Sequence, residues 1–311
     1  MYHGIINVYK EPGYTSHDVV ARLRGILKQK KIGHTGTLDP EAQGVLPVCL
    51  GMGTRLCDLL TERDKTYRAV MLLGRETDTQ DTTGTTLKSS QQEAMALSEP
   101  AVREAVAGFV GPYEQVPPMY SALKVDGKKL YELAREGKVV ERRARPVTIY
   151  SIEVEEIALP RVTMTVSCSK GTYIRTLCHD IGRALGCGGC MEALTRTMAA
   201  GFSIDGSLKL DQIEALSQRG EIGSRILPVE EALKGYPAVS ALAEADALAC
   251  NGNPLFKRHL ASWPDQGEDG HMFRLYTSEG SFVGIYVYQR ERRWLKPYKM
   301  FLAGPKEGER R

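Results

Sequence analysis

Apolar and polar residues follow one another along most of the chain in patterns that predict both strands and helices. Residues 4–9 are predicted to form a short strand, and Ser16 is a suitable N-cap for the helix that follows. Residues 30–44 are polar and rich in glycine, which predicts a loop, and an apolar run follows at 45–50. The apolar face of the first helix would consist of Val19, Val20, Leu23, Ile26 and Leu27.

The same patterns predict further elements up to about residue 217. Strands are expected at 67–73, 119–125, 147–157, 162–168 and 194–202. Helices are expected at 101–110, 129–135, 173–185 and 210–217. The segment 77–86 is polar and has no apolar period, so a loop is expected there. Strands and helices therefore alternate throughout this part of the chain.

The pattern changes near Tyr236 and Pro237, where a short helix at 241–250 is followed by strands at 273–277, 281–288 and 294–301. This predicts a large domain over residues 1–234 and a small β-rich domain with a short tail over residues 235–311, within the usual range of domain sizes. The small domain mixes aromatic and basic side chains, which suits RNA because rings stack on bases and cations bind phosphate. These residues are Tyr286, Tyr288, Trp294 and Tyr298, with Arg290, Arg292, Arg293, Lys296 and Lys299.

Composition narrows the class of protein. The 311 residues are 42% hydrophobic, enough to bury a sizeable core, and the formal net charge of +3 excludes a histone-like binder but not a local basic patch. A second basic cluster lies at Arg142, Arg143 and Arg145. No apolar run reaches the roughly 20 residues of a membrane helix, and the N-terminus lacks the features of a signal peptide. With seven scattered cysteines, the chain is predicted to be cytoplasmic.

Cys187 and Cys190 form a C-x-x-C pair, with Cys178 and His179 nearby. A structural zinc site usually needs a second pair of ligands at similar spacing, and none follows in the sequence. We therefore interpret the pair as part of a glycine-containing turn at the end of a helix and predict no metal site.

The segment KIGHTGTLDPEAQGVL, residues 31–46, holds a single aspartate, Asp39, between glycines. Gly36 and Gly44 permit unusual backbone angles and the close approach of a bulky ligand. Pro40 favours an extended conformation at Asp39. An ordinary surface loop is the competing interpretation, since these residue types are also common in turns.

The motif GHTGTLDPEAQGVL resembles the signature of the tRNA pseudouridine-55 synthases. Further motifs resemble the family in the expected order and cover most of the first 235 residues. They are VYKEPGYTSHDVV (8–20), KTY (65–67) with TDTQDTTG (77–84), PPMYSALKVDGKKLYELAREG (117–137) and CSKGTYIRTLCHDIGRALG (168–186). The C-terminal module is similar in position, size and strand pattern to a PUA domain. The resemblance implies a mixed α/β, α+β-like pseudouridine synthase fold with a largely antiparallel central sheet.

The resemblance also implies the reaction. A uridine of the tRNA T-loop flips out of its stack, its N1–C1′ bond breaks, the uracil turns, and C5 bonds to C1′, without a cofactor or metal. Asp39 would be the catalytic carboxylate. It could attack C1′, attack C6 of the base or remove the C2′ proton, and the sequence leaves the three routes open.

The remaining family positions give expected roles to neighbours of Asp39. Arg175 would pair with the aspartate and keep it ionised. Tyr67 would stack on the flipped base and could accept the C5 proton, whereas Tyr173 and Leu194 would line the pocket. His34 would contact the rearranged T-loop. Lys10 and Pro12 would support the active-site loop.

Other functions remain open from the sequence. A tRNA-binding chaperone would need the RNA surface but not Asp39, and an RNA glycosidase would release free uracil. A related family member works as the catalytic subunit of guide-RNA particles and usually carries long charged tails. This chain ends about ten residues after the last predicted strand. We therefore expect a stand-alone monomer without an obligate protein partner, whose tRNA affinity falls steeply with salt.

Overall fold

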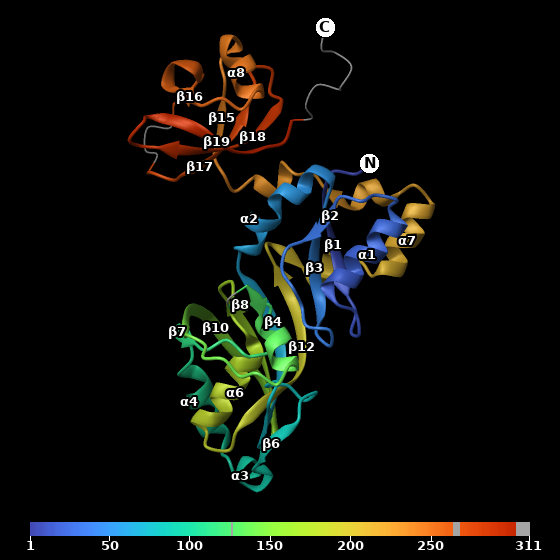
Figure 1. Cartoon of the computed structure of the whole chain (residues 1–311), viewed down its shortest axis with the longest axis vertical. Helices are drawn as coiled ribbons and strands as arrows, with labels where there is room; N and C mark the ends of the chain where they lie inside the picture. The colour runs from blue at the N-terminus through green and yellow to red at the C-terminus, as the bar shows by residue number, and fades with distance from the viewer. Residues whose placement is uncertain (126, 264–267, 303–311) are drawn as a thin grey trace. The chain divides into compact units, whose positions relative to one another are not determined.

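A computed structural model describes residues 1–125, 127–263 and 268–302 (Figure 1). The α-helices are α1 (Ser16–Ile26), α2 (Cys57–Thr61), α3 (Gln91–Met95), α4 (Glu99–Ala107), α5 (Leu130–Arg135), α6 (Ile174–Ala184), α7 (Leu210–Gln218) and α8 (Asp246–Cys250). The longer strands are β1 (Gly4–Lys10), β3 (Gln43–Leu50), β4 (Lys65–Leu73), β7 (Gly111–Gln115), β10 (Arg145–Ala158), β11 (Arg161–Cys168), β12 (Gly189–Ala199), β17 (Met272–Tyr276), β18 (Phe282–Gln289) and β19 (Trp294–Met300).

Short strands complete the set. They are β2 (Ile32–His34), β5 (Arg75–Thr77), β6 (Thr86–Ser89), β8 (Lys124–Val125), β9 (Lys128–Lys129), β13 (Phe202–Ser203), β14 (Ile226–Leu227), β15 (Ala238–Ser240) and β16 (Leu255–Phe256). The predicted mixed fold with a large sheet is thereby confirmed. The longest sheet follows the order β14-β1-β3-β12-β4-β11-β10-β7. β12 pairs antiparallel with β4 and parallel with β3, and the pairs from β4 to β7 are antiparallel.

Several local predictions need correction. The strand expected at 119–125 is confined to its last two residues. The Ser121 amide donates to the Met119 carbonyl at 2.9 Å, which closes a turn, and the Met119 side chain packs with α5. The helix expected at 241–250 begins only at Asp246. In addition, β2 occupies part of the predicted loop at 30–44.

The N-cap of α1 is Thr15, not Ser16. The Thr15 hydroxyl accepts from the Asp18 amide at 3.1 Å, and the Asp18 carboxylate accepts from the Thr15 amide at 2.8 Å, forming a capping box. Ser16 is freed from that role and accepts from the Leu38 amide at 3.0 Å instead. This bond joins the start of α1 to the residue before Asp39.

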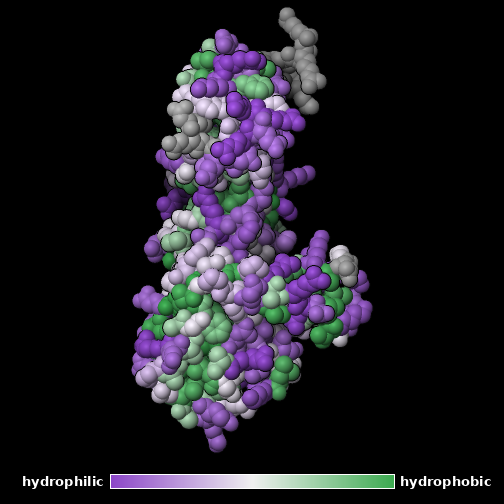
Figure 2. All heavy atoms as spheres, turned by 90° about the vertical axis from the view of Figure 1, so that its left-hand side faces the viewer, coloured by the Kyte–Doolittle hydropathy of each residue, from purple (hydrophilic) through white to green (hydrophobic). Residues whose placement is uncertain are grey.

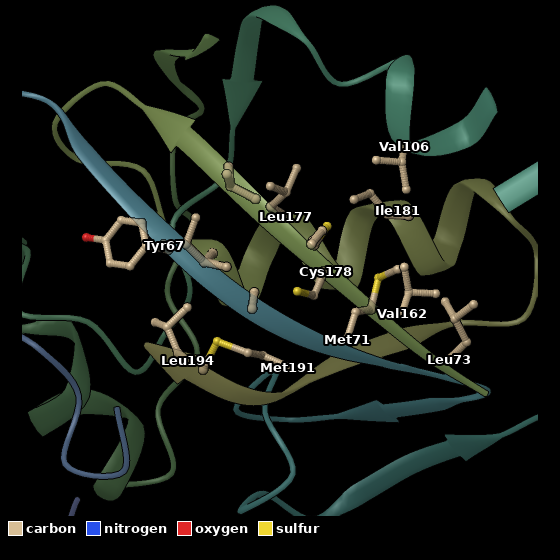
Figure 3. Packing of buried hydrophobic residues seen from close by; sticks show 14 of the residues in the cluster. Tyr67, Met71, Leu73, Val106, Val162, Leu177, Cys178, Ile181, Met191 and Leu194 are labelled. Atoms are coloured by element: carbon tan, nitrogen blue, oxygen red, sulfur yellow. The ribbon is translucent and has the colours of Figure 1, made fainter. Parts of the chain in front are cut away.

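The main hydrophobic core lies between α6 and the strands β4, β11 and β12. Figure 3 shows Met71 of β4, Val162 of β11 and Met191 of β12 packed against Leu177, Cys178 and Ile181 of α6. Tyr67 and Leu194 lie together at one end of this cluster. The core therefore fixes α6, which carries Arg175, against the strands that carry Tyr67 and Leu194.

Gly182 lies where α6 approaches the start of β12 most closely. An added Cβ would stand 2.2 Å from the amide nitrogen of Gly189, so the backbone would have to shift. We expect Gly182→Ala to lower the free energy of unfolding by about 1–3 kcal/mol in urea titrations. Gly25→Ala, in α1, is the matched control: its Cβ would have nothing within 4 Å, so stability should stay constant or rise by up to about 1 kcal/mol. Equal losses in both variants would contradict this packing argument.

The chain divides into two compact units. One comprises residues 6–48 and 57–222, and the other comprises residues 1–5, 49–56 and those from Gly223 onward. The second unit contains a five-stranded sheet in the order β15-β17-β18-β19-β16. Its core includes Phe273, Leu275 and Leu295, and the buried Tyr286 hydroxyl donates to the Ala249 carbonyl at 3.1 Å. The domain boundary at 234/235 and the PUA-like character stay predictions, and the short tail lies outside the described residues.

Figure 2 shows hydrophilic side chains over most of the face in view, with smaller hydrophobic areas between them. No helix among the described residues is both long and apolar enough to cross a membrane.

Candidate active site

Asp39 lies in the loop between β2 and β3, which backbone contacts hold in place. The Gly13 amide donates to the Pro40 carbonyl at 3.0 Å, and the Ala42 amide donates to the Asp39 carbonyl at 3.1 Å. Gly44 has a φ of +105°, and a Cβ there would stand 2.3 Å from the Arg196 carbonyl oxygen. A side chain at position 44 would therefore push the loop off β12.

Lys10 is a buried support of the same loop. Its ammonium donates to the carbonyl of Ala42 at 2.6 Å, to that of Pro40 at 2.8 Å and to that of Glu11 at 3.2 Å. Burial lowers the pKa of Lys10 from its usual 10.5 to about 8, although Glu41 and Asp39 favour the charged form. The side chain thus ties the backbone that follows Asp39 to the end of β1.

Lys10→Met is expected to lower the free energy of unfolding by about 1–3 kcal/mol because buried carbonyls lose their donor. The loss should depend on pH. Between about 8 and 10.5 the unfolded state keeps the Lys10 proton that the folded state has released, so wild-type stability gains with rising pH relative to the variant. Urea unfolding at pH 7.5, 9 and 10 measures both effects. A stability difference that does not change over this range would contradict the lowered pKa.

Arg175 meets Asp39 from the first turn of α6. Its Nε lies 2.9 Å from Oδ2 of Asp39, and its Nη2 lies 3.4 Å from Oδ1, so both carboxylate oxygens are engaged. The Arg175 side chain is 5% exposed, whereas that of Asp39 is 42% exposed. The carbonyls of Thr79 and Tyr120 accept from the same guanidinium at 2.9 and 2.8 Å. A buried, fixed arginine therefore orients a carboxylate that solvent and substrate can reach.

A second carboxylate, Asp81, was not singled out from the sequence. Its Oδ2 lies 3.7 Å from Nη1 of Arg175, and its side chain is 17% exposed. Its Oδ1 accepts from the Thr79 hydroxyl at 2.8 Å and from the Thr83 amide at 3.0 Å. Asp81 thus shapes the loop whose Thr79 carbonyl holds Arg175. The available signal was an aspartate among threonines in TDTQDTTG, a composition that favours side-chain bonds to the local backbone.

Tyr67 and Leu194 form an apolar wall on the sheet beside the Asp39 loop. Both are buried and belong to the same cluster as Leu38 and Ala42, which flank Asp39 (Figure 3). Burial raises the pKa of the Tyr67 phenol, and the Arg196 guanidinium opposes that rise.

Tyr173 and His34 take different positions. Tyr173 is the residue before α6, and both its backbone groups bond to the Gln115 side chain, at 2.8 and 3.0 Å. Burial raises the pKa of its phenol, and the charge of Arg175 opposes that rise. His34 ends β2 and lies edge-on to His17, with ring centres 5.4 Å apart. Burial and the charges of His17 and Arg196 lower the pKa of His34, which favours a neutral imidazole.

The cysteines form no disulfide, and burial raises the pKa of Cys190 to about 11. Gly186 and Gly188 have φ values of +77° and +76°, so the C-x-x-C lies at a glycine-containing turn after α6. No group of three histidine, cysteine or acidic residues among the described residues could hold a metal ion.

Arg196 was not singled out from the sequence, yet it is 1% exposed and lies opposite Tyr67 on the neighbouring strand. Its Nε donates to the Val45 carbonyl at 2.7 Å and its Nη2 to the Gly36 carbonyl at 3.3 Å. The alternation of β12, which places residue 196 on the buried face of Leu194, was the signal that could have found it. The site as a whole offers an accessible, oriented carboxylate next to a buried aromatic ring, an arrangement suited to attack on a planar ring or its sugar.

Comparisons with known proteins identify the family of the chain. Residues 24–174 match the model of the TruB family pseudouridylate synthase N-terminal domain, and residues 175–234 match that of the tRNA pseudouridylate synthase B C-terminal domain. A curated tRNA pseudouridine synthase B of Lachnoclostridium phytofermentans is 48% identical over 96% of this chain and 100% of its own. The protein of that name from Staphylococcus epidermidis is 41% identical, over 97% and 100%.

Two solved structures share the fold of this chain. A chain in an H/ACA RNP bound to a substrate RNA containing 2′-deoxyuridine superposes with a TM-score of 0.74 at 27% identity, covering 97% of this chain and 86% of its own. A chain of a Cbf5-Nop10-Gar1 complex gives 0.74 at 29% identity, covering 96% and 85%.

Proposed function

The chain belongs to the TruB family of pseudouridylate synthases, and from this membership we propose that it converts uridine 55 in the T-loop of tRNA to pseudouridine, with Asp39 as the catalytic carboxylate. It is an RNA isomerase, so the prediction of an enzyme rather than a binding protein alone is confirmed. The observation that supports Asp39 is its double contact with the buried Arg175, combined with the accessibility of its own side chain.

The reaction assigns each group of the site a task. The target uridine leaves its stack and enters beside Asp39, and the N1–C1′ bond breaks. After the ring turns, C5 bonds to C1′, the proton on C5 leaves, and N1 takes up a proton, so the product is an isomer of the substrate. Arg175 keeps the Asp39 carboxylate oriented during these steps. Tyr67 and Leu194 hold the flat faces of the base, and Tyr173 closes the pocket near Arg175.

RNA contacts outside the pocket belong to the basic segments. In the second unit, the Arg292 guanidinium lies over the Trp294 ring at 5.0 Å, which combines a cation for phosphate with a ring for stacking. In the first unit, the positive charges of Arg142, Arg143 and Arg145 would contact the RNA backbone. His34 would contact the T-loop of the tRNA. We propose that the enzyme acts as a cytosolic monomer, and the lack of a disulfide among the described cysteines supports the reducing compartment.

The test is to incubate the purified protein alone with an unmodified tRNA transcript and to map pseudouridine by mass spectrometry. Pseudouridine at position 55 is expected, and it should be absent from a transcript with cytidine at that position. Free uracil in the supernatant would favour a glycosidase. Refolding of tRNA without any modified base would favour a chaperone, and activity that requires an added guide RNA or protein would contradict a stand-alone enzyme.

A further inference from the structure

Arg196 is a buried cation to which the mechanism above gives no task. Within the described residues, no carboxylate lies at ion-pair distance from it, and its guanidinium donates to the neutral carbonyls of Val45 and Gly36. A buried charge is costly unless an opposite charge compensates it. The cost of burying the Arg196 charge must therefore be offset by an interaction that a neutral side chain could not make.

Two buried lysines near Arg196 increase the free-energy cost of burying its charge. Lys10 and Lys65 are also buried, and burial lowers the pKa of each to about 8, with the charge of Arg196 contributing in both cases. The ammonium of Lys65 donates to the carbonyls of Thr61 and Arg63. Three basic side chains thus lie beneath the site, and the two lysines serve to hold the backbone.

Tyr67 is the polar side chain next to which Arg196 is placed. Arg196 of β12 and Tyr67 of β4 are directly opposite each other in the antiparallel register. Both are buried, so their side chains project to the same face at the spacing of a cross-strand pair. The charge of the Arg196 guanidinium opposes the rise that burial causes in the pKa of the Tyr67 phenol. In Figure 3 the Tyr67 hydroxyl points away from the aliphatic residues of the cluster.

Arg196 also contacts the loop that carries Asp39, through both its backbone and its side chain. Its backbone pairs with Gly44 in the parallel register of β12 and β3, and its side chain donates to the carbonyls of Gly36 and Val45. These two carbonyls stand on either side of Asp39 in the sequence. One residue therefore holds the backbone of the Asp39 loop through its guanidinium and stands directly opposite Tyr67 on the neighbouring strand.

We propose that Arg196 is a positioning residue of the isomerase, which fixes the Tyr67 hydroxyl relative to the Asp39 loop so that the flipped base is held between ring and carboxylate. The inference rests on the proposed function. Because the planar fork of arginine serves several acceptors at once, lysine should replace it only in part. A displacement of about 1 Å between the two groups would slow the chemical step without weakening the contacts that bind the rest of the tRNA.

The test is a double-mutant cycle with Tyr67→Phe, measured as single-turnover rates of pseudouridine formation with enzyme in excess. Arg196→Lys should lower the rate about 10- to 100-fold and change the tRNA dissociation constant less than about twofold. In the Tyr67→Phe background, the same substitution should lower the rate less than about threefold, because the hydroxyl through which Arg196 acts is gone. Equal losses in both backgrounds would overturn the proposal, since they would mean that Arg196 supports the fold alone.

Two further variants keep the result interpretable. Arg196→Gln removes the buried charge but keeps a donor, so it is expected to fold even if the lysine variant does not, and it should show the same dependence on Tyr67. Arg68→Lys is the matched control on β4, where Arg68 forms an exposed pair with Glu155 at 2.7 Å, and its rate should stay at the wild-type value. Wild-type protein that makes no pseudouridine would overturn the proposed function together with this inference, whereas an active wild type with an additive cycle would overturn the inference alone.

Discussion

Asp39→Asn is expected to abolish pseudouridine formation, with a single-turnover rate at least about 10,000-fold below wild type. Asparagine has nearly the same shape and can still accept one bond from Arg175, so the loop should keep its structure. It lacks the negative charge, however, and can neither attack carbon nor remove a proton effectively. Mass-spectrometric mapping of uridine 55 after incubation with excess enzyme measures the residual rate.

The binding of tRNA provides the control for this variant. Because the Asp39 side chain is 42% exposed, its neutralisation should leave the unfolding midpoint and the tRNA dissociation constant close to those of wild type. If Asp39→Asn bound tRNA normally and still formed pseudouridine at the wild-type rate, Asp39 would not be the catalytic group. A variant that lost both activity and tRNA binding would argue that Asp39 shapes the binding surface instead.

Arg175→Lys is expected to give the second-largest effect, a rate loss of about 100-fold. A lysine keeps the charge but cannot contact both oxygens of Asp39 while also donating to the carbonyls of Thr79 and Tyr120. Carbonyls left without a donor should also lower the free energy of unfolding by about 1–3 kcal/mol. Single-turnover kinetics and urea unfolding measure the two effects separately.

Arg161→Lys is the matched control for that change. Arg161 also contacts both oxygens of a carboxylate, Glu192, at 2.7 and 2.9 Å, but its side chain is 54% exposed. Water screens such a surface pair, so the substitution should lower the free energy of unfolding by less than about 1 kcal/mol. It should leave the single-turnover rate of pseudouridine formation unchanged. Similar losses for Arg161→Lys and Arg175→Lys would mean that burial and the carbonyl partners of Arg175 do not matter.

Local patterns were enough to predict β1, β4, β10, β11 and part of β12, because alternation every second residue records which face of a strand is buried. They showed β3 only as an apolar run and did not predict β7. They failed where tertiary contacts decide the backbone. Residues 119–123 have the composition of a strand, yet a turn at Ser121 and packing against α5 prevent it. Ser16 has the chemistry of an N-cap, but the capping box between Thr15 and Asp18 takes that role and leaves Ser16 to bind Leu38.

The site could be predicted only in part. The glycines around Asp39 indicated a close backbone approach, and the resemblance to a family supplied Arg175, which lies 136 residues further along the chain. Nothing in the local sequence indicates that Asp81 and the Tyr120 carbonyl would meet the same guanidinium. The buried positions of Lys10 and Arg196 likewise depend on the packing of the loop on the sheet, which no pattern along one segment records.

The position of β12 in the sheet affects how the chain folds while the ribosome synthesises it. β12 lies between β3 and β4, although it follows both of them by more than a hundred residues. A nascent polypeptide that ends before Gly189 already contains Asp39 and Arg175, but its sheet is still missing a central strand. Contacts of such large sequence separation form late and slowly, so the growing chain is expected to stay inactive until translation has passed β12.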